Sequence, residues 1–282
     1  MKFSHPEADL FVPNGVTAEA ALARTTHLCI AAHQDDIEIM AYHGIAACFG
    51  RADKAFTGVV VTNGAGSSRT GVYADYTDEA MQAVRRKEQR KAAFIGDYAA
   101  QVQLAHPSSA VKDTKNAAIQ ADLAAILAAC SPQVVYLHQP ADRHDTHVAV
   151  LSHSLRALRA LPAAKRPTRV LGCEVWRDLD WLGDADKQTL DVGAYPNLAA
   201  SLVGVFDSQI TGGKRYDLAT AGRRLANATY AASHSTDQHQ GITWAVDLTP
   251  LIRDPQLSVR DFTQQFITRF QEDVAARLAK FF

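Results

Sequence analysis

Three polar segments of this sequence contain the residue types that bind metals and move protons. One of them, residues 32–38, places His33 beside the adjacent carboxylates Asp35 and Asp36. Two neighbouring carboxylates repel each other unless a cation compensates their charge, and a divalent metal ion would do so. Another, residues 139–147, contains His144 and His147, which are three positions apart and therefore share one face of a helix.

These side chains form a candidate zinc site. His33, Asp36 and one histidine of the His144/His147 pair would supply two imidazole nitrogens and one carboxylate oxygen, with a fourth position open to water. That donor set is typical of catalytic zinc, and the lack of a thiolate argues against structural zinc. Asp35 would then be free to point elsewhere. Alone, an Asp-Asp pair is commonly a helix cap and a histidine pair commonly structural, but their joint occurrence after two predicted strands favours a metal site.

The remaining polar segment, residues 63–71, is rich in glycine and follows a predicted strand. It does not match the dinucleotide-binding fingerprint, because Arg69 stands where the third glycine is required. It does not match a phosphate-binding loop either, because Val72 follows Gly71 where Lys-Ser/Thr is needed. We therefore do not expect nucleotide binding.

The elements that position these segments alternate between strands and helices. Short apolar runs without alternation predict buried strands at residues 27–32, 56–62, 133–138 and 170–176. Helical patterns occupy residues 77–96, 110–130, 148–161 and 198–233, the last interrupted at Gly212-Gly213. This order predicts an α/β fold, doubly wound and Rossmann-like, with a mainly parallel sheet covered by helices on both faces. Ligands bind beyond the carboxyl ends of such strands, so we expect the three polar segments to converge.

An amphipathic helix is predicted at about residues 258–282. Its apolar residues recur every four positions, at Phe262, Phe266, Phe270, Val274 and Leu278. Such a helix either docks on the core of its own chain or forms a contact between subunits of a homo-oligomer. We expect a single α/β domain over residues 1–282 that ends with this helix.

Composition narrows the class of partner. The chain has 282 residues, is 47% hydrophobic, and has 29 basic against 30 acidic residues, so no broad charge favours nucleic acid or an anionic membrane. No signal-peptide pattern or membrane span is expected. The cysteines are widely spaced, as in the reduced core of a cytoplasmic protein, at Cys29, Cys48, Cys130 and Cys173. A small molecule is the expected partner.

The motifs resemble those of the PIG-L/LmbE-like zinc deacetylases, which remove acetyl groups from N-acetylglucosamine conjugates. Residues 33–38 (HQDDIE) match the family's first motif, with Gln34 in place of the usual proline. Residues 62–64 (TNG) and 85–88 (RRKE) match its second element. Residues 142–147 (DRHDTH) match the third in part, since Thr146 stands where the family has an aspartate. The resemblance covers about residues 25–160.

The resemblance implies a role for each motif residue. His33, Asp36 and His147 would hold one zinc ion per chain. Asp35 would be the general base that takes a proton from water. His144, protonated, would donate to the oxyanion that develops on the acetyl group.

Further candidates come from their positions alone. Arg85, on the helix after the glycine segment, could contact a substrate hydroxyl or phosphate, or could lie on a solvated helix face paired with Glu88. Glu174, Trp176 and the Ser208-Gln209 pair are candidates for reaching the site from later in the chain.

The resulting hypothesis is a zinc-dependent N-deacetylase acting on an N-acetylglucosamine-type sugar or conjugate. A metal-dependent hydrolase of another small amide or ester would use the same residues. A sugar-binding module without turnover is a third reading, but it has no need of an unligated base such as Asp35.

Overall fold

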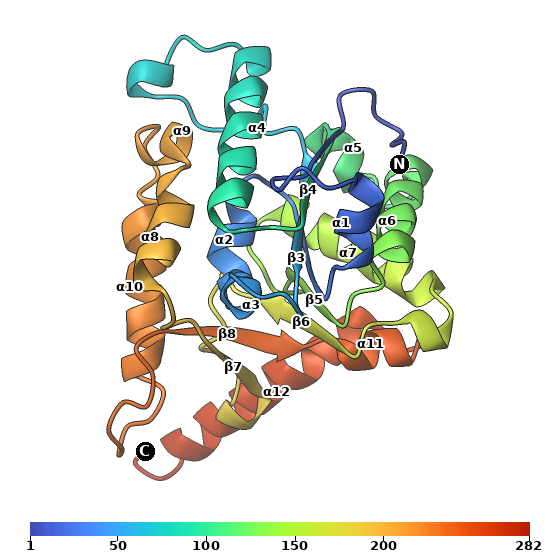
Figure 1. Ribbon diagram of the computed structural model, residues 1–282. Coiled ribbons are helices and arrows are strands. Elements are labelled where there is room, and N and C mark those ends of the chain that lie inside the picture. The colour runs from blue at the N-terminus through green and yellow to red at the C-terminus, as the bar shows by residue number, and fades with distance from the viewer.

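An eight-stranded sheet lies at the centre of the computed structural model, which describes residues 1–282, and helices cover both faces (Figure 1). The strands are β1 (Asp9–Phe11), β2 (His27–Ala31), β3 (Phe56–Thr62), β4 (Ala100–His106), β5 (Val134–His138), β6 (Arg169–Cys173), β7 (Lys187–Asp191) and β8 (Ile242–Asp247). The helices are α1 (Ala18–Ala23), α2 (Asp36–Met40), α3 (Tyr42–Cys48), α4 (Asp78–Ile95), α5 (Ser108–Lys112), α6 (Ala117–Cys130), α7 (Asp145–Ala160), α8 (Pro196–Gly204), α9 (Asp207–Ile210), α10 (Tyr216–Thr229), α11 (Thr249–Arg253) and α12 (Val259–Leu278).

The strand order is β1-β4-β3-β2-β5-β6-β8-β7. The five strands from β4 to β6 are parallel, whereas β1 pairs antiparallel with β4 and β8 pairs antiparallel with both β6 and β7. From β2 the chain first extends the sheet through β3 to β4, and later through β5 to β6 on the other side. The carboxyl ends of β2 and β5 therefore flank the point where the strand order reverses, which is where ligands bind in doubly wound sheets.

Two apolar cores hold the layers together. One packs α1, α6, α7 and α11 against one face of the sheet, and the other packs α2, α3, α4 and α8 against the opposite face. Every residue of β2 and β3 is buried, as expected for strands without polar alternation. The mainly parallel sheet with helices on both faces, predicted from the sequence, is confirmed.

Helix α4 begins and ends where its sequence predicts. The Thr77 hydroxyl accepts a hydrogen bond from the Ala80 N–H, Asp78 and Glu79 lie in the first turn, and Gly96 is the C-cap. Helix α7 begins three residues before the predicted start, because the His144 ring acts as its N-cap and accepts a hydrogen bond from the Thr146 N–H.

Two long helical patterns are divided in the structure. Residues 110–130, expected as one helix, form α5 and α6, because the Asn116 side chain accepts the N–H groups of Ala118 and Ile119 and starts a new helix. Residues 198–233 form α8, α9 and α10. The predicted break at Gly212-Gly213 is present, since Gly213 has φ 105° and a Cβ on Gly212 would lie 2.0 Å from the Ser208 carbonyl oxygen.

Four strands were not predicted from the sequence: β1, β4, β7 and β8. Strand β4 shows the reason, because Gln101, Gln103 and His106 make its sequence polar although all three side chains are buried. The predicted strand 170–176 ends early, at Cys173. Its next residue, Glu174, leaves the ladder and accepts the Trp244 N–H of β8 with its carboxylate at 2.8 Å.

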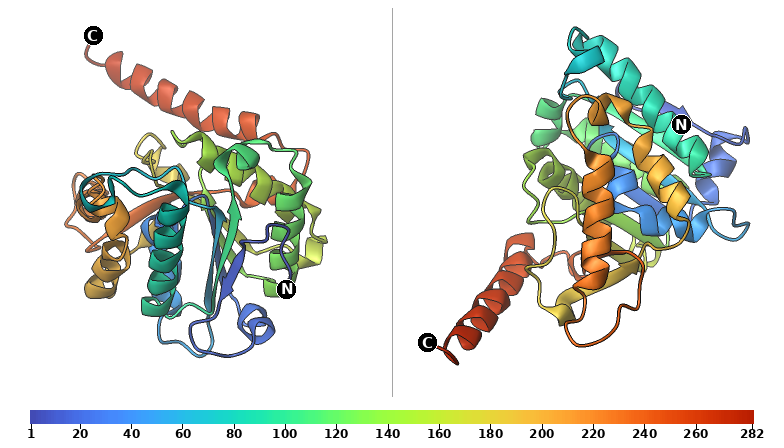
Figure 2. Two further views of the ribbon diagram at one scale, coloured as in Figure 1. Left: turned by 90° about the horizontal axis from the view of Figure 1, so that it is seen from above. Right: turned by 90° about the vertical axis from the view of Figure 1, so that its left-hand side faces the viewer.

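Helix α12 is docked over its first half only. Phe262 and Phe266 are buried, whereas Phe270, Val274 and Leu278 are exposed. Figure 2 shows the helix extending away from the rest of the molecule towards its C-terminal end. Arg269 anchors it near the midpoint through two 2.9 Å contacts with the Asp186 carboxylate.

The four cysteines are free and buried, as predicted. Across the whole chain, no helix combines the length and the apolar character needed to cross a membrane.

Candidate active site

Three side chains meet at the strand-order reversal, and they are those expected as metal ligands. His33 follows β2, Asp36 begins α2, and His147 lies in the first turn of α7. His33 Nδ1 lies 3.2 Å from His147 Nε2. Asp36 Oδ2 lies 3.3 Å from His33 Nδ1 and 3.4 Å from His147 Nε2. The same carboxylate oxygen accepts the His33 N–H at 2.7 Å, which fixes its direction.

This triangle of donor atoms fits a zinc ion. Tetrahedral zinc with ligand bonds of about 2.0–2.1 Å requires donors about 3.3 Å apart, which is the separation found here. Two imidazole nitrogens and one carboxylate oxygen are also the donor types of catalytic zinc sites. His147 closes the triangle, whereas His144, the other histidine of the pair, does not belong to it.

Asp142 supports His147 from behind. Its Oδ1 lies 3.4 Å from His147 Nδ1, on the side of the ring away from the triangle, and accepts the His144 N–H at 2.9 Å. Its Oδ2 accepts the Trp176 N–H at 3.2 Å. A carboxylate in this place fixes the tautomer and direction of a ligating imidazole. Asp142 was quoted in the third motif but given no role, although an aspartate two residues before a helix cap is a recognisable turn signal.

His138, at the end of β5, packs against two members of the triangle, His147 and Asp36. Its ring stacks on His147 with centroids 3.9 Å apart, and its Nε2 accepts the Ala32 N–H at 2.9 Å. Burial lowers the pKa of His138 well below its ordinary value. Burial alone would raise the pKa of Asp36, but His147, His33 and His138 hold it well below the usual range. Asp36 is therefore ionised and the His138 ring is neutral.

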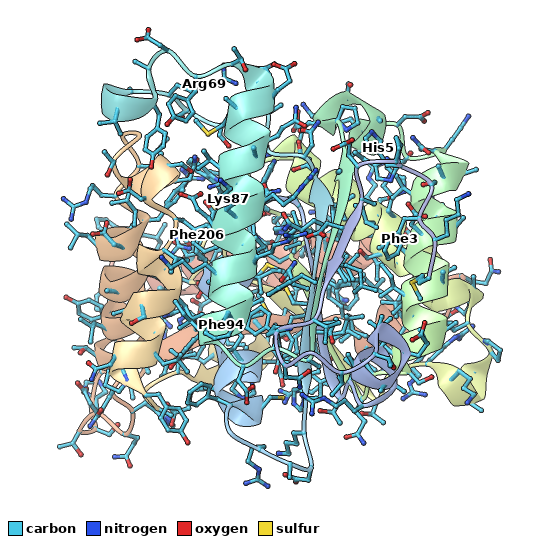
Figure 3. The ribbon with its side chains drawn as sticks, turned by 45° about the horizontal axis from the view of Figure 1, so that its top comes forward. Phe3, His5, Arg69, Lys87, Phe94 and Phe206 are labelled. Atoms are coloured by element: carbon cyan, nitrogen blue, oxygen red, sulfur yellow. The ribbon has the colours of Figure 1, made fainter.

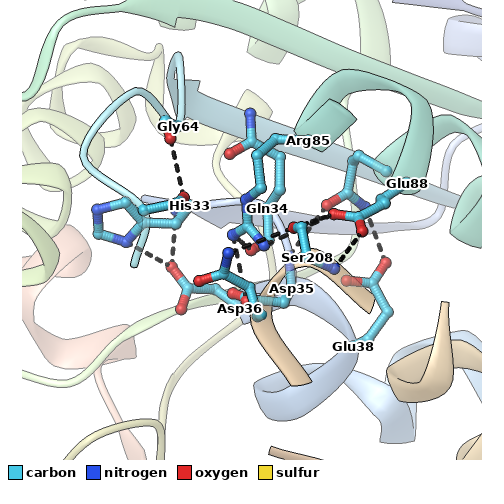
Figure 4. A network of polar contacts seen from close by, with 12 residues as sticks. His33, Gln34, Asp35, Asp36, Glu38, Gly64, Arg85, Glu88 and Ser208 are labelled. Carbon is cyan, nitrogen blue, oxygen red and sulfur yellow. Dashed lines mark hydrogen bonds and ion pairs between the residues drawn. The ribbon is translucent and has the colours of Figure 1, made fainter. Parts of the chain in front are cut away.

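Asp35 does not belong to the triangle, although it is the neighbour of Asp36 in the sequence. Its φ of 91° is in the left-handed region, and two residues of α4 hold it there. Arg85 Nη2 lies 3.2 Å from Asp35 Oδ2 and also donates to the Gln34 carbonyl, and Gln89 Oε1 accepts the Asp35 N–H at 3.2 Å (Figure 4). Burial raises the pKa of Asp35 to about 7, against the lowering effect of Arg85.

Arg85 is 2% exposed, so the solvated-face reading is wrong. Its Nη1 is 3.9 Å from a Glu88 oxygen. Phe206, which Figure 3 labels next to α4, has its ring 5.9 Å from the Arg85 guanidinium carbon. Glu88 instead accepts the N–H and the hydroxyl of Ser208, each at 2.7 Å. Arg85 Nε and Nη1 have no hydrogen-bond partner in the protein, and Arg85 lines the cavity described below.

His144 differs from expectation in its charge. Burial and the neighbouring His33 and His147 rings lower the pKa of His144 to about 4, which favours a neutral ring at pH 7 over the protonated form expected from the sequence. Because Nδ1 accepts the Thr146 N–H, the proton of the neutral ring is on Nε2. The ring still has a donor to offer.

A buried polar network lies beneath the loop. Glu38 Oε1 accepts hydrogen bonds from Gln89 Nε2 and Tyr98 OH, both at 2.8 Å. Gln89 thus links Glu38 to the Asp35 backbone. Neither Gln89 nor Tyr98 belongs to one of the motif segments, so the sequence alone does not predict their part in the site.

A cavity of about 490 Å³ opens on this site. It is lined by parts of all three polar segments and by residues from later in the chain, among them Glu174, Trp176, Gln209, Lys214 and Tyr216. The Trp176 ring lies 6.3 Å from the His144 ring, and Lys214 Nζ lies 5.2 Å from the Trp176 centroid. Of the later candidates, Glu174, Trp176 and Gln209 reach the cavity, whereas Ser208 binds Glu88. Lys214 and Tyr216 were missed because they stand in a loop and at a helix start without a motif.

Comparison with solved structures shows a shared fold. The conserved protein TT1542 from Thermus thermophilus is 19% identical, with a TM-score of 0.59, over 83% of this chain and 99% of that chain. GalB, the 4-carboxy-2-hydroxymuconate hydratase from Pseudomonas putida, is 16% identical, with a TM-score of 0.58, over 83% and 98%. The N,N'-diacetylchitobiose deacetylase from Pyrococcus horikoshii is 16% identical, with a TM-score of 0.57, over 78% and 83%.

At sequence level, no curated protein matches the chain. Residues 28–158 match the family model described as PIG-L: GlcNAc-PI de-N-acetylase. The matched range contains the triangle, Asp35, Arg85, Asp142 and His144. This segment, which carries every motif residue recognised in the sequence, is therefore similar to the PIG-L family over a little under half of the chain.

Proposed function

We propose that the chain is a zinc-dependent hydrolase that removes the N-acetyl group from an N-acetylglucosamine-type sugar or conjugate. The observation that carries the proposal is the triangle of His33, Asp36 and His147, which opens on a cavity beside the unligated Asp35. The description of the matched family model supports it. So does the similarity in fold to a protein named as a diacetylchitobiose deacetylase.

One zinc ion per chain would be held by the triangle. Bound there, zinc would polarise the acetyl carbonyl and lower the pKa of water. Asp142 would keep His147 Nε2 directed at the ion, because the Asp142 carboxylate lies 3.4 Å from the opposite ring nitrogen. The ionised Asp36 would supply a negative charge that partly neutralises the divalent cation.

Asp35 and His144 would handle the protons. Asp35 would take the proton of the attacking water and deliver it to the amide nitrogen as the bond to the acetyl carbon breaks. Arg85 holds this carboxylate, and Gln89 holds the Asp35 backbone N–H. The Nε2–H of neutral His144 would donate to the carbonyl oxygen as negative charge develops on it.

The rest of the cavity would hold the sugar. Arg85 offers two unpartnered N–H positions to hydroxyl or phosphate oxygens. Trp176 and Tyr216 provide aromatic surface at the side of His144, with their rings 6.3 Å apart.

Free buried cysteines support the cytoplasmic location expected from the sequence.

The decisive experiment is a substrate panel of N-acetylated sugars and sugar conjugates, simple esters and acetylated peptides. Acetate and free amine are measured with added zinc, with chelator and with Asp35→Asn. We expect acetate from N-acetylglucosamine-type compounds, lost with chelator and in the variant. Turnover of esters or peptides only would point to another amidase or esterase, and sugar binding without turnover to a binding module. Because GalB is named as a hydratase, turnover that releases no acetate would also contradict the proposal.

A further inference from the structure

The second half of α12 lacks the packing that stabilises the first. Beyond Phe266 its apolar side chains are exposed: Ile267 41%, Phe270 44%, Val274 39%, Leu278 52% and, just past the helix, Phe281 81%. Figure 2 shows this half standing clear of the body. A short helical stretch without tertiary contacts is marginal in water, and a contiguous apolar stripe marks a contact surface.

We propose that this stripe, Ile267, Phe270, Val274, Leu278 and Phe281, pairs antiparallel with the same stripe of a second copy of the chain. The spacings along the stripe are three, four, four and three residues, so the stripe is symmetric about Val274. A two-fold axis through Val274 places Ile267 opposite Phe281 of the partner subunit, and Phe270 opposite Leu278 of the partner subunit. Val274 meets its own copy. Such self-complementarity is what an isologous two-fold contact requires.

The charges favour the antiparallel direction. Glu272 and Asp273 precede Val274, and Arg277 and Lys280 follow it. An antiparallel pair brings the acidic part of one helix beside the basic part of the other, and none of these charges meets its like. A parallel pair in register would place every one of them beside its own copy. Within the exposed half, Arg269 is paired with Asp186, and Arg277 is paired with Asp273 of its own helix.

The stripe is as long as the exposed half of α12, so two such halves can pair along their length. Val274 is the midpoint between Ile267, where the exposed half begins, and Phe281. Residue 282 would lie opposite Phe266 of the partner subunit, where the helix meets its own body. The two exposed halves would therefore cover each other over about 22 Å, at 1.5 Å per residue.

The test measures molar mass by light scattering and by sedimentation from roughly 1 to 100 µM, the range for a contact of this size. We expect the wild type to approach twice the mass of the chain. Val274→Glu and Val274→Lys each place like charges on the axis, so each alone should weaken dimerisation at least about tenfold. An equimolar mixture of the two should restore the dimer. Val274 is exposed, so both variants should show wild-type thermal unfolding at low concentration.

Leu225→Glu is the matched control, because Leu225 is a 60% exposed leucine on α10, away from the stripe. It should leave the mass unchanged. A wild type that stays monomeric throughout, a dimer that survives Val274→Glu, or one that Leu225→Glu abolishes would overturn the proposal.

Crosslinking tests the direction. Under mild oxidation Val274→Cys should form a disulfide with its own copy. Ile267→Cys should not, but should crosslink to Phe281→Cys in a mixture of the two variants. Crosslinking of Ile267→Cys to itself, without the mixed product, would show a parallel pair and contradict the proposed arrangement.

Discussion

At the scale of single residues, Asp35 and Asp36 show how neighbours acquire different chemistry. Asp36 lies within 3.6 Å of three imidazole nitrogens, which lower its pKa. Asp35 adopts a left-handed backbone conformation and turns towards α4, where burial raises its pKa to about 7. The first environment suits a metal ligand and the second suits a proton acceptor.

We expect substitution of the two aspartates to separate metal binding from turnover. Asp36→Asn should lower the zinc content, since it removes the anionic donor. Asp35→Asn should keep near-stoichiometric zinc and lower kcat about 10²-fold or more, the usual worth of a positioned base. Elemental analysis and acetate release measure the two effects. The opposite pattern would reverse the assigned roles.

Gln89 is expected to act on turnover through Asp35. Gln89→Leu removes the hydrogen bond to the Asp35 N–H, so kcat should fall about tenfold, the equivalent of one hydrogen bond, while KM and zinc content stay near wild type. Gln82→Leu on the same helix is the control, because Gln82 makes no hydrogen bond to the loop. A higher KM with kcat unchanged would show that Gln89 does not position the base.

His144 should serve as a neutral donor. Because its pKa is about 4, its charge does not change between about pH 6 and 9, and it should contribute no limb to the pH–rate profile in that range. His144→Ala should lower kcat about 10²-fold or more, as the loss of an oxyanion donor does, without changing the shape of the profile. His144→Gln, which keeps an N–H donor, should recover part of the loss. An alkaline limb that disappears in His144→Ala would mean that the protonated ring is the active form.

At the scale of elements, the glycine segment after β3 shows how a loop adapts to its neighbours. Gly64 has φ 77°, and a Cβ there would lie 2.7 Å from Gln34 Oε1 and 3.1 Å from Arg85 Cγ. Gly66, two residues on, has open space around it. Of these two, only Gly64 must be a glycine, because the loop passes close over Arg85.

Gly64→Ala should therefore destabilise the protein by about 1–3 kcal/mol, through backbone strain and contact with Gln34 and Arg85. It should also lower kcat, because Arg85 holds Asp35. Gly66→Ala should leave both properties near wild type. Urea denaturation and acetate release compare the two variants, and equal effects would show that loop flexibility, not close approach, is what matters.

At the scale of the whole molecule, the proposed metal ligands come from the two sides of the sheet. His33 and Asp36 follow β2, and His147 belongs to α7 after β5. A metal ion at this position links two βα units on either side of the strand-order reversal. Metal binding should therefore be coupled to the stability of the fold.

Removal of zinc should lower the melting temperature, and returning it should restore the loss. At about 100 times Kd, zinc should stabilise the fold by about 2.7 kcal/mol. Asp36→Asn should show little response to chelator or to added zinc in the same concentration range. Calorimetry with and without chelator measures the shift. An identical melting temperature for wild-type protein with and without zinc would place the ion elsewhere.

What the sequence determined by itself is local. Residue type and spacing identified the imidazoles and carboxylates, the apolar runs of β2, β3 and β5, and the Thr77 cap of α4, because each depends on neighbours in the chain. The burial of Gln101 and Gln103 in β4 could not be predicted in this way, because the residues they contact are distant in the sequence.

The tertiary structure decided what depends on burial and on distant segments. It placed His147 rather than His144 in the triangle, because the β2 loop and α7 meet only across the sheet. It buried Arg85 against Asp35, and it lowered the pKa of His144 by burying the ring beside two other imidazoles. Desolvation and through-space charge are set by residues that the chain brings together from far apart, and no local pattern encodes them.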